Sequence, residues 1–310
     1  MNLTMLEKNA RILIGMPVYN GDKHIGETIE SILGQTFGDF RLLISDNAST
    51  DNTEEICRSY AQQDSRVNYY RQPQNLGMAP NFNYVFSPGE TPYFKWAAHD
   101  DIIKPNYLRR CIDWLDNDSS LAMAHCPTLC IDDQSNEVGT YQDIGLASEH
   151  INERFWRVLW TVNIYEIYGV MRSQCVAKTK LAGSYFGSER NILAEVLLQG
   201  NIGYLDQALF ARRDHAGSLT AMHLESKVEH NFSQRQEAHA SGVNMSGVQT
   251  SAIRFREYFS SLLKYSMPGG ERAQCFAHLM DWGFKRTLEG LTGSGEAHRQ
   301  KIYAQLNQEV

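Results

Sequence analysis

Short apolar runs alternate with stretches of helical periodicity between residues 11 and 126, and this alternation constrains the fold more than any other feature. The first run, 11–16 (RILIGM), stops at Pro17 and a Tyr-Asn-Gly-Asp turn, as a buried strand would. In the following stretch, 23–35, three isoleucines and Leu33 form one apolar stripe at helical spacing. Repetition of this strand and helix unit predicts an α/β fold with a mostly parallel sheet flanked by helices.

The same pattern continues along the chain. We expect further strands at 40–45, 66–71, 93–98 and 121–126, and helices at 51–63, near 80–86 and from Pro105. Past about residue 225 the sheet-like runs stop, and the sequence predicts helices at 252–265 and 273–288. The chain is therefore expected to divide into an α/β domain over 1–224 and a helical C-terminal region over 225–310.

Composition argues against several classes of protein. A formal net charge of −7 gives no general attraction to a polyanion, so we expect no nucleic-acid partner. The roughly 18 uninterrupted apolar residues of a membrane span do not occur, so we expect no transmembrane segment and a cytoplasmic protein, free or peripheral at the inner membrane face. The six cysteines lack the paired spacing of a zinc site and are expected to be free, buried thiols.

Three polar clusters follow predicted strands, at 19–20, 46–49 and 99–101. Ligands of such sheets bind at the carboxyl ends of the strands, so these clusters should converge on one site. The residues after the first strand, PVYNGDKHIG, contain no glycine-rich phosphate loop, so a nucleotide would be held by other chemistry. Asp100 and Asp101 offer oxygen ligands for Mg²⁺ or Mn²⁺, although an acidic pair taken alone more often begins a solvated helix.

Taken in order, PVYN at 17–20, SDNASTD at 45–51, HDD at 99–101 followed by Pro105, and a later helix segment resemble glycosyltransferase family 2. The resemblance covers about residues 10–220. It implies a GT-A fold, a Rossmann-like sheet whose nucleotide-sugar half lies at about 10–126 and whose acceptor half lies at about 127–224.

The resemblance also implies a function. Members of this family transfer a sugar with inversion from a nucleotide diphosphate-sugar, most commonly a UDP-sugar. The acceptor would be a hydroxyl of a glycan, a lipid-linked sugar or a protein, in bacterial polysaccharide or glycoconjugate synthesis.

The family pattern assigns nucleotide contacts to four residues of the predicted strand ends. Pro17 and Tyr19 belong to the PVYN segment, and an aromatic face such as that of Tyr19 suits stacking on the base, although simple packing fits it equally well. Asp46 would accept hydrogen bonds from the base or the ribose. His99 would face the ribose or a phosphate, unless it is only an exposed loop histidine.

The metal motif of the family is incomplete here. Its Asp-x-Asp aligns with Ala98-His99-Asp100, so the first carboxylate is missing and Asp100 remains the expected ligand for Mg²⁺ or Mn²⁺, with weaker dependence on the ion. The segment LFARRDHAGS resembles the terminal R-x-H-x-x-S stretch of the family. His215 would there reach the metal or the diphosphate, and the neighbouring Arg212 and Arg213 would hold phosphate.

Sugar transfer needs a base that deprotonates the acceptor hydroxyl, and a carboxylate facing the donor suits this task. The family places it at a helix start, eleven positions before a glycine, and Glu189 precedes Gly200 by this interval. Glu189 is the predicted base, unless it only stabilises the helix dipole. Glu195 is the rival, but it lies in mid-helix among apolar residues.

Several alternatives stay open on sequence alone. Trp156 and Trp160 suit an acceptor-sugar platform, although core packing is the more ordinary role. A nucleotidyltransferase would use a similar sheet and acidic pair, but it normally carries a lysine-bearing glycine-rich loop. The missing first Asp also fits a catalytically degenerate sugar-nucleotide binder. The C-terminal helices suit a homodimer interface, a membrane-facing surface or a wall of the acceptor site.

Overall fold

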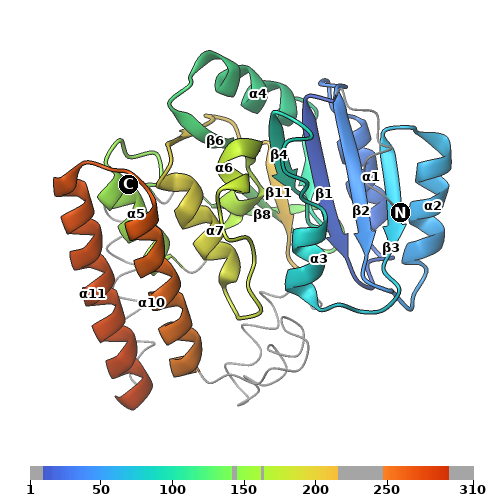
Figure 1. The fold of residues 1–310 in the computed structure, drawn as a ribbon. Helices are drawn as coiled ribbons and strands as arrows, with labels where there is room; N and C mark the ends of the chain where they lie inside the picture. The colour runs from blue at the N-terminus through green and yellow to red at the C-terminus, as the bar shows by residue number, and fades with distance from the viewer. Residues whose placement is uncertain (1–9, 142–144, 162–163, 216–246, 293–310) are drawn as a thin grey trace.

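The structure is a computed structural model that describes residues 10–141, 145–161, 164–215 and 247–292 (Figure 1). Strands and helices alternate in the first part of the chain, as predicted. These elements are β1 (Ile12–Val18), α1 (Ile25–Leu33), β2 (Phe40–Asp46), α2 (Thr53–Gln63), β3 (Val67–Arg71), α3 (Met78–Tyr84), β4 (Tyr93–Trp96), β5 (Ile102–Ile103), α4 (Tyr107–Asn117) and β6 (Leu121–His125).

The second part of the chain has shorter strands and ends in two long helices. Its elements are β7 (Thr128–Ile131), β8 (Glu137–Tyr141), α5 (Ile151–Trp160), the 3₁₀ helix η2 (Tyr165–Tyr168), β9 (Val170–Arg172), α6 (Ser173–Ala177), α7 (Ser188–Leu197), β10 (Asn201–Tyr204), β11 (Phe210–Arg213), α10 (Gly247–Lys264) and α11 (Gly269–Thr292).

Two sheets organise the described residues. The larger sheet has the strand order β10-β6-β9-β4-β1-β2-β3, and every pairing in it is parallel except those of β9 with β4 and β6. The smaller sheet has the order β5-β11-β7-β8, in which β11 pairs parallel with β7. This mixed, mostly parallel α/β architecture confirms the predicted fold class.

The side chains of β1 alternate between the two faces of the larger sheet. Ile12 and Ile14 enter the apolar cluster under α1, α2 and α4, whereas Leu13 enters the cluster on the opposite face. Gly15 lies on the face of Leu13, where a Cβ atom would come within 2.6 Å of Val85. The absence of a side chain at Gly15 therefore lets the chain after α3 pack directly on the central strand.

The C-terminal helices α10 and α11 share the core of the rest of the protein. They lie side by side against α5 and α7, at the end of the molecule opposite α2 (Figure 1). Tyr258 and Trp282, both fully buried, join Phe155 of α5 in one apolar cluster, which also includes Phe94 and Trp96 of β4. The helical region thus packs on the α/β part through a continuous hydrophobic core.

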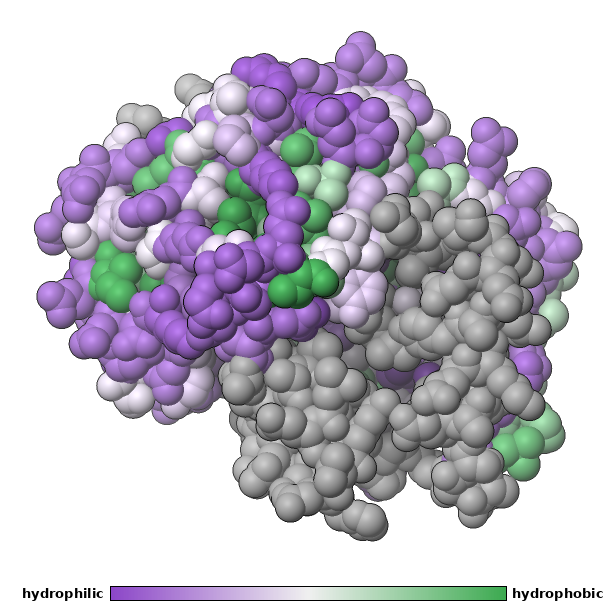
Figure 2. Space-filling model, turned by 180° about the vertical axis from the view of Figure 1, so that it is seen from behind, coloured by the Kyte–Doolittle hydropathy of each residue, from purple (hydrophilic) through white to green (hydrophobic). Residues whose placement is uncertain are grey.

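Among the coloured residues of the face seen in Figure 2, hydrophilic ones predominate and hydrophobic ones form separate patches. Large exposed apolar side chains occur mainly on α10 and α11. They are Phe259, Leu263, Met280, Phe284 and Leu288. None of the helices in the described part of the chain is both long enough and apolar enough to span a bilayer.

Candidate active site

The loops after β1 and β2 are tied together by direct hydrogen bonds. The backbone N–H of Asn20 donates to Ser49 Oγ at 2.9 Å, and the Asn20 side chain accepts from the backbone N–H of Thr50 at 2.8 Å. Asn20 and Ala48 both adopt positive φ angles, of 51° and 62°, which non-glycine residues rarely do. The first two polar clusters therefore form one rigid assembly at the carboxyl ends of these strands.

The third cluster, after β4, lies against the first. The carbonyl oxygen of His99 accepts a hydrogen bond from Thr28 Oγ1 at 3.0 Å. A Cβ atom on Gly21 would come within 2.6 Å of the His99 ring, so this ring packs on the glycine backbone. All three polar clusters predicted to converge are thus brought to one end of the sheet.

Tyr19 and Asp46 differ sharply in exposure. Tyr19 is 45% exposed, so its ring is free to meet a planar ligand. Asp46 is fully buried and accepts hydrogen bonds from Tyr69 at 2.6 Å, from Arg71 at 3.0 Å and from the backbone N–H of Ser49 at 2.8 Å. The predicted contact between Asp46 and the base therefore needs Tyr69 or Arg71 to move aside, and neither of these residues was singled out in the sequence.

Pro17 lies in β1 opposite Ser45 of β2. It is only partly exposed, and no described contact bears on its predicted role against the nucleotide.

Asp100 and His215 are brought together from distant parts of the chain. His215 Nε2 lies 2.9 Å from Asp100 Oδ2, and both side chains are mostly buried. Burial alone would raise the pKa of Asp100, but the hydrogen bond with His215 and the nearby imidazoles outweigh it and lower that pKa. The two predicted metal ligands are therefore neighbours, and Asp100 is held as a carboxylate.

Asp101 has a different environment from its neighbour. Its side chain accepts a hydrogen bond from the backbone N–H of Arg213 at 3.0 Å. Burial, reinforced by the charge of Asp100, raises the pKa of Asp101 to about 8. The acidic pair is thus split into a carboxylate, Asp100, and a buried acid, Asp101, that fastens the loop to β11.

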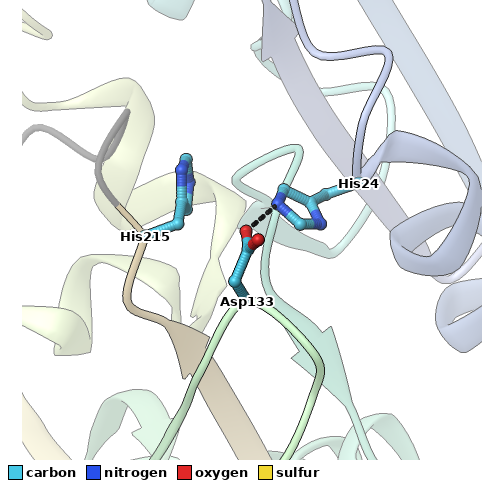
Figure 3. Close-up of side chains that lie close together, drawn as sticks. All are labelled: His24, Asp133 and His215. Atoms are coloured by element: carbon cyan, nitrogen blue, oxygen red, sulfur yellow. Dashed lines mark hydrogen bonds and ion pairs between the residues drawn. The ribbon is translucent and has the colours of Figure 1, made fainter.

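His24 and Asp133, which the sequence reasoning missed, lie beside His215. His24 immediately precedes α1 and Asp133 lies in the turn between β7 and β8; Figure 3 shows their side chains meeting near the His215 ring. His24 Nε2 is 3.1 Å from Asp133 Oδ1, and the two imidazole rings are 5.1 Å apart between centroids. Burial, with the charges of Arg213 and His215, lowers the pKa of His24. The only sequence signal for these residues was the absence of the first motif carboxylate.

Arg212 and Arg213 point to opposite sides of β11, as successive strand residues do. Arg212 pairs with Asp214 at 2.6 Å and its guanidinium lies 5.0 Å from the centre of the Tyr165 ring. The fully buried Arg213 donates to Glu27, to the backbone carbonyls of Asp100 and Asp132, and to Ser135. The Arg213 side chain is therefore committed to contacts within the chain, and the role of Arg212 with phosphate stays a prediction.

Glu189 lies in the first turn of α7, as predicted. Its Oε2 atom is buried and, among the described residues, has no hydrogen-bond partner. The side chain lies near Tyr168, whose pKa is raised by burial first and then by the charges of Asp101, Asp100 and Glu189. One carboxylate oxygen of Glu189 is thus left without a donor among the described residues, and the role of Glu189 as the base stays a prediction.

Glu195 is occupied elsewhere. It is buried, accepts a hydrogen bond from the backbone N–H of Lys180 at 2.7 Å and another from Ser261 of α10 at 3.0 Å. These contacts join α7 to α10, so Glu195 supports packing.

The two tryptophans of α5 face the C-terminal helices. Trp160 is buried with Lys285 over its ring at 5.4 Å, and Trp156 lies 6.3 Å from the His278 ring. Contacts with α11 therefore account for both side chains.

Comparison with known proteins adds a family context. Residues 13–169 match the family described as "Glycosyl transferase family 2". Glycosyltransferase GlyG of Streptococcus pneumoniae serotype 4 is 24% identical over 264 residues, which cover 82% of this chain and 86% of that protein. An uncharacterized glycosyltransferase of Rickettsia typhi is 32% identical over 128 residues, 41% of this chain; the chain spans only 39% of that relative.

A solved structure shares the fold. That of TarS residues 1–349 from S. aureus in complex with UDP-GlcNAc aligns with a TM-score of 0.65 and 16% identity, over 88% of this chain and 72% of that one. At this identity, the likeness establishes a shared fold over most of the chain.

Proposed function

The chain belongs to glycosyl transferase family 2, and on this premise we propose that it transfers a sugar, with inversion, from a nucleotide diphosphate-sugar to an acceptor hydroxyl. The observation that carries the proposal is Glu189, whose buried carboxylate oxygen has no partner among the described residues and whose charge, like those of Asp101 and Asp100, acts on Tyr168. A UDP-sugar is the proposed donor, and UDP-GlcNAc, which TarS binds, is the first to test. The acceptor is a hydroxyl of a glycan, a lipid-linked sugar or a protein.

Donor binding is assigned to the assembly at the ends of β1, β2 and β4. Tyr19 stacks on the base, and Pro17, in β1, is assigned a further contact with the nucleotide. Asp46 holds Tyr69 and Arg71 at the base edge and accepts from the base once one of them moves. His99 and Arg212 are assigned to the ribose and the phosphates. This placement is supported by the exposure of Tyr19 and by the hydrogen bonds that join the loops after β1 and β2.

In the proposed reaction, Glu189 accepts the proton of the acceptor hydroxyl while the oxygen of that hydroxyl forms a bond to the anomeric carbon of the donor sugar. The bond from that carbon to the diphosphate breaks in the same displacement, which inverts the configuration.

Asp100 and His215 would hold a divalent cation, and their carboxylate and imidazole donors fit Mn²⁺ better than Mg²⁺. Such an ion, when bound, neutralises the charge of the leaving diphosphate.

The decisive experiment compares two glutamate variants of one helix. Glu189→Gln should lower turnover of UDP-GlcNAc by about 10²- to 10⁴-fold, because the general base is removed. Calorimetry should show unchanged affinity for the donor. Glu195→Gln is the matched control and should affect stability more than turnover per folded molecule. Full activity of Glu189→Gln would remove the proposed base.

The absence of the first motif carboxylate, at Ala98, favours one second candidate, a sugar-nucleotide binder without turnover. The two functions separate on donor hydrolysis. Release of UDP from UDP-GlcNAc supports the transferase, whereas calorimetric binding without any release supports the binder. Undiminished release in EDTA would show that the reaction does not need the cation.

A further inference from the structure

Three segments far apart in sequence place His24, Asp133 and His215 around one point (Figure 3). They come from the residue before α1, the turn between β7 and β8, and the end of β11. One ligand atom from each of the three side chains lies within 4.8 Å of the other two. We propose that these residues form a transition-metal site in which His215, the ligand that the family pattern suggests, is joined by His24 and Asp133, which the pattern does not assign and which stand in for the carboxylate missing at Ala98.

The donor set decides the class of ion. Two imidazoles with one carboxylate suit Mn²⁺, Zn²⁺ or Co²⁺, whereas Mg²⁺ favours oxygen ligands and keeps its waters. Ligand atoms about 2.1 Å from one ion lie roughly 3–4 Å from each other. His24 Nε2 and Asp133 Oδ1, at 3.1 Å, already have this spacing. A small contraction of the third contact would close the set around a single ion.

The neighbours of the cluster both orient it and compete with the ion. Asp100, the other proposed ligand, lies 2.9 Å from His215 Nε2, which is a spacing that two ligands of one ion have, and its contact fixes the ring until an ion binds. Lys23 Nζ lies 2.6 and 2.5 Å from the two oxygens of Asp133, where its ammonium takes the place of a cation. Because the Lys23 side chain is 61% exposed, it can turn into solvent when an ion binds.

Only the part that the ion plays in sugar transfer rests on the proposed function. The contact of His215 with Asp100 places the site next to the position expected for the diphosphate. Binding of the metal can be measured without any sugar donor. Failure of the site and failure of the reaction are therefore distinguishable. Mn²⁺ binding that depends on His24 and Asp133, in a chain without transfer, would leave the site standing.

The full chain is first treated with a chelator, which is then removed. It is titrated with Mn²⁺ alone, and free Mn²⁺ is measured by electron paramagnetic resonance. The wild type should bind one ion at this site, and His24→Ala and Asp133→Asn should each weaken binding at least tenfold. Lys23→Met should tighten it, because the competing ammonium is removed. His150→Ala is the matched control, since His150 also contacts a carboxylate, Glu271 at 3.3 Å, but on the surface.

Thermal unfolding of each variant shows that the chain is folded before the titration. Equal Mn²⁺ affinity in the wild type, His24→Ala and Asp133→Asn would overturn the site, as would a wild type that binds no Mn²⁺. Weaker binding in Lys23→Met would also count against it, because removal of an ammonium that competes for Asp133 should not reduce the affinity for a cation.

Discussion

Removal of the Arg213 guanidinium should destabilise the whole candidate site. Arg213 is fully buried, and its four side-chain hydrogen bonds reach Glu27 of α1 at 2.6 Å, the Asp100 carbonyl at 3.0 Å, the Asp132 carbonyl at 3.1 Å and Ser135 Oγ at 2.9 Å. These contacts tie together α1, the loop after β4 and the turn after β7. Arg213→Met keeps most of the aliphatic volume and removes every one of these donors.

The expected loss follows from which partners water can reach. Glu27 is 44% exposed, so its carboxylate can be solvated and its share is small. The two backbone carbonyls lose a buried donor, at roughly 1–3 kcal/mol each. We therefore expect the free energy of unfolding to fall by about 2–5 kcal/mol. The stability of Arg213→Lys should lie between those of the wild type and Arg213→Met, because an ammonium cannot reach all the partners of the planar guanidinium.

Urea denaturation followed by circular dichroism and tryptophan fluorescence measures this change. Arg110→Met is the matched control: Arg110 pairs with Asp206, whose side chain is 79% exposed, and its loss should cost less than about 1 kcal/mol. An Arg213→Met variant no less stable than Arg110→Met would refute the reasoning. The same variant should also bind Mn²⁺ more weakly, because the segments carrying His24 and Asp133 are no longer fastened together.

Three further outcomes follow from the fold and the site. Trp282→Ala should lower the free energy of unfolding by about 3–5 kcal/mol in a single urea transition, whereas Phe284→Ala, 65% exposed on the same helix, should change it by less than about 0.5 kcal/mol. Burial lowers the pKa of His125 to about 3, so the unfolded chain binds a proton that the native state excludes between about pH 6.5 and 3. The free energy of unfolding should therefore decrease as the pH is lowered across this window, by up to about 1.4 kcal/mol per pH unit. Urea titrations of His125→Gln at the same pH values should lack this decrease. Tyr19→Ala should weaken UDP binding by about 1–3 kcal/mol in calorimetry, and Tyr141→Ala, another exposed tyrosine, should not.

Before residue 127 the sequence predicts most strands and helices to within a few residues. The strand expected at 40–45 is β2 (Phe40–Asp46), and the helix expected at 51–63 is α2 (Thr53–Gln63). Every residue of β2 is buried, and a strand that is buried on both faces of a sheet is expected to be mostly apolar, as this run is. The C-terminal helices were also predicted, because helical spacing persists there after the strand signals stop.

The smaller sheet was not predicted, and the reason is physical. Its strands are two to five residues long, and β8 is exposed at every position. Such segments have too few residues to establish a periodicity. Their pairing order also depends on contacts between residues far apart in sequence. The position of β11 between β5 and β7 is therefore a property of the folded chain that local patterns do not contain.

That unpredicted order is what assembles the proposed metal site. His215 follows β11 and Asp133 follows β7, so the parallel pairing of these two strands brings their ends together. His24 reaches them from the start of α1, next to the Tyr19 loop that the family motif does mark. The sequence could show that a carboxylate was missing at Ala98, but a replacement ligand need only be near in space. In a chain whose motif lacks a ligand, histidines and carboxylates at the ends of neighbouring strands are therefore the first residues to examine, whatever their separation along the sequence.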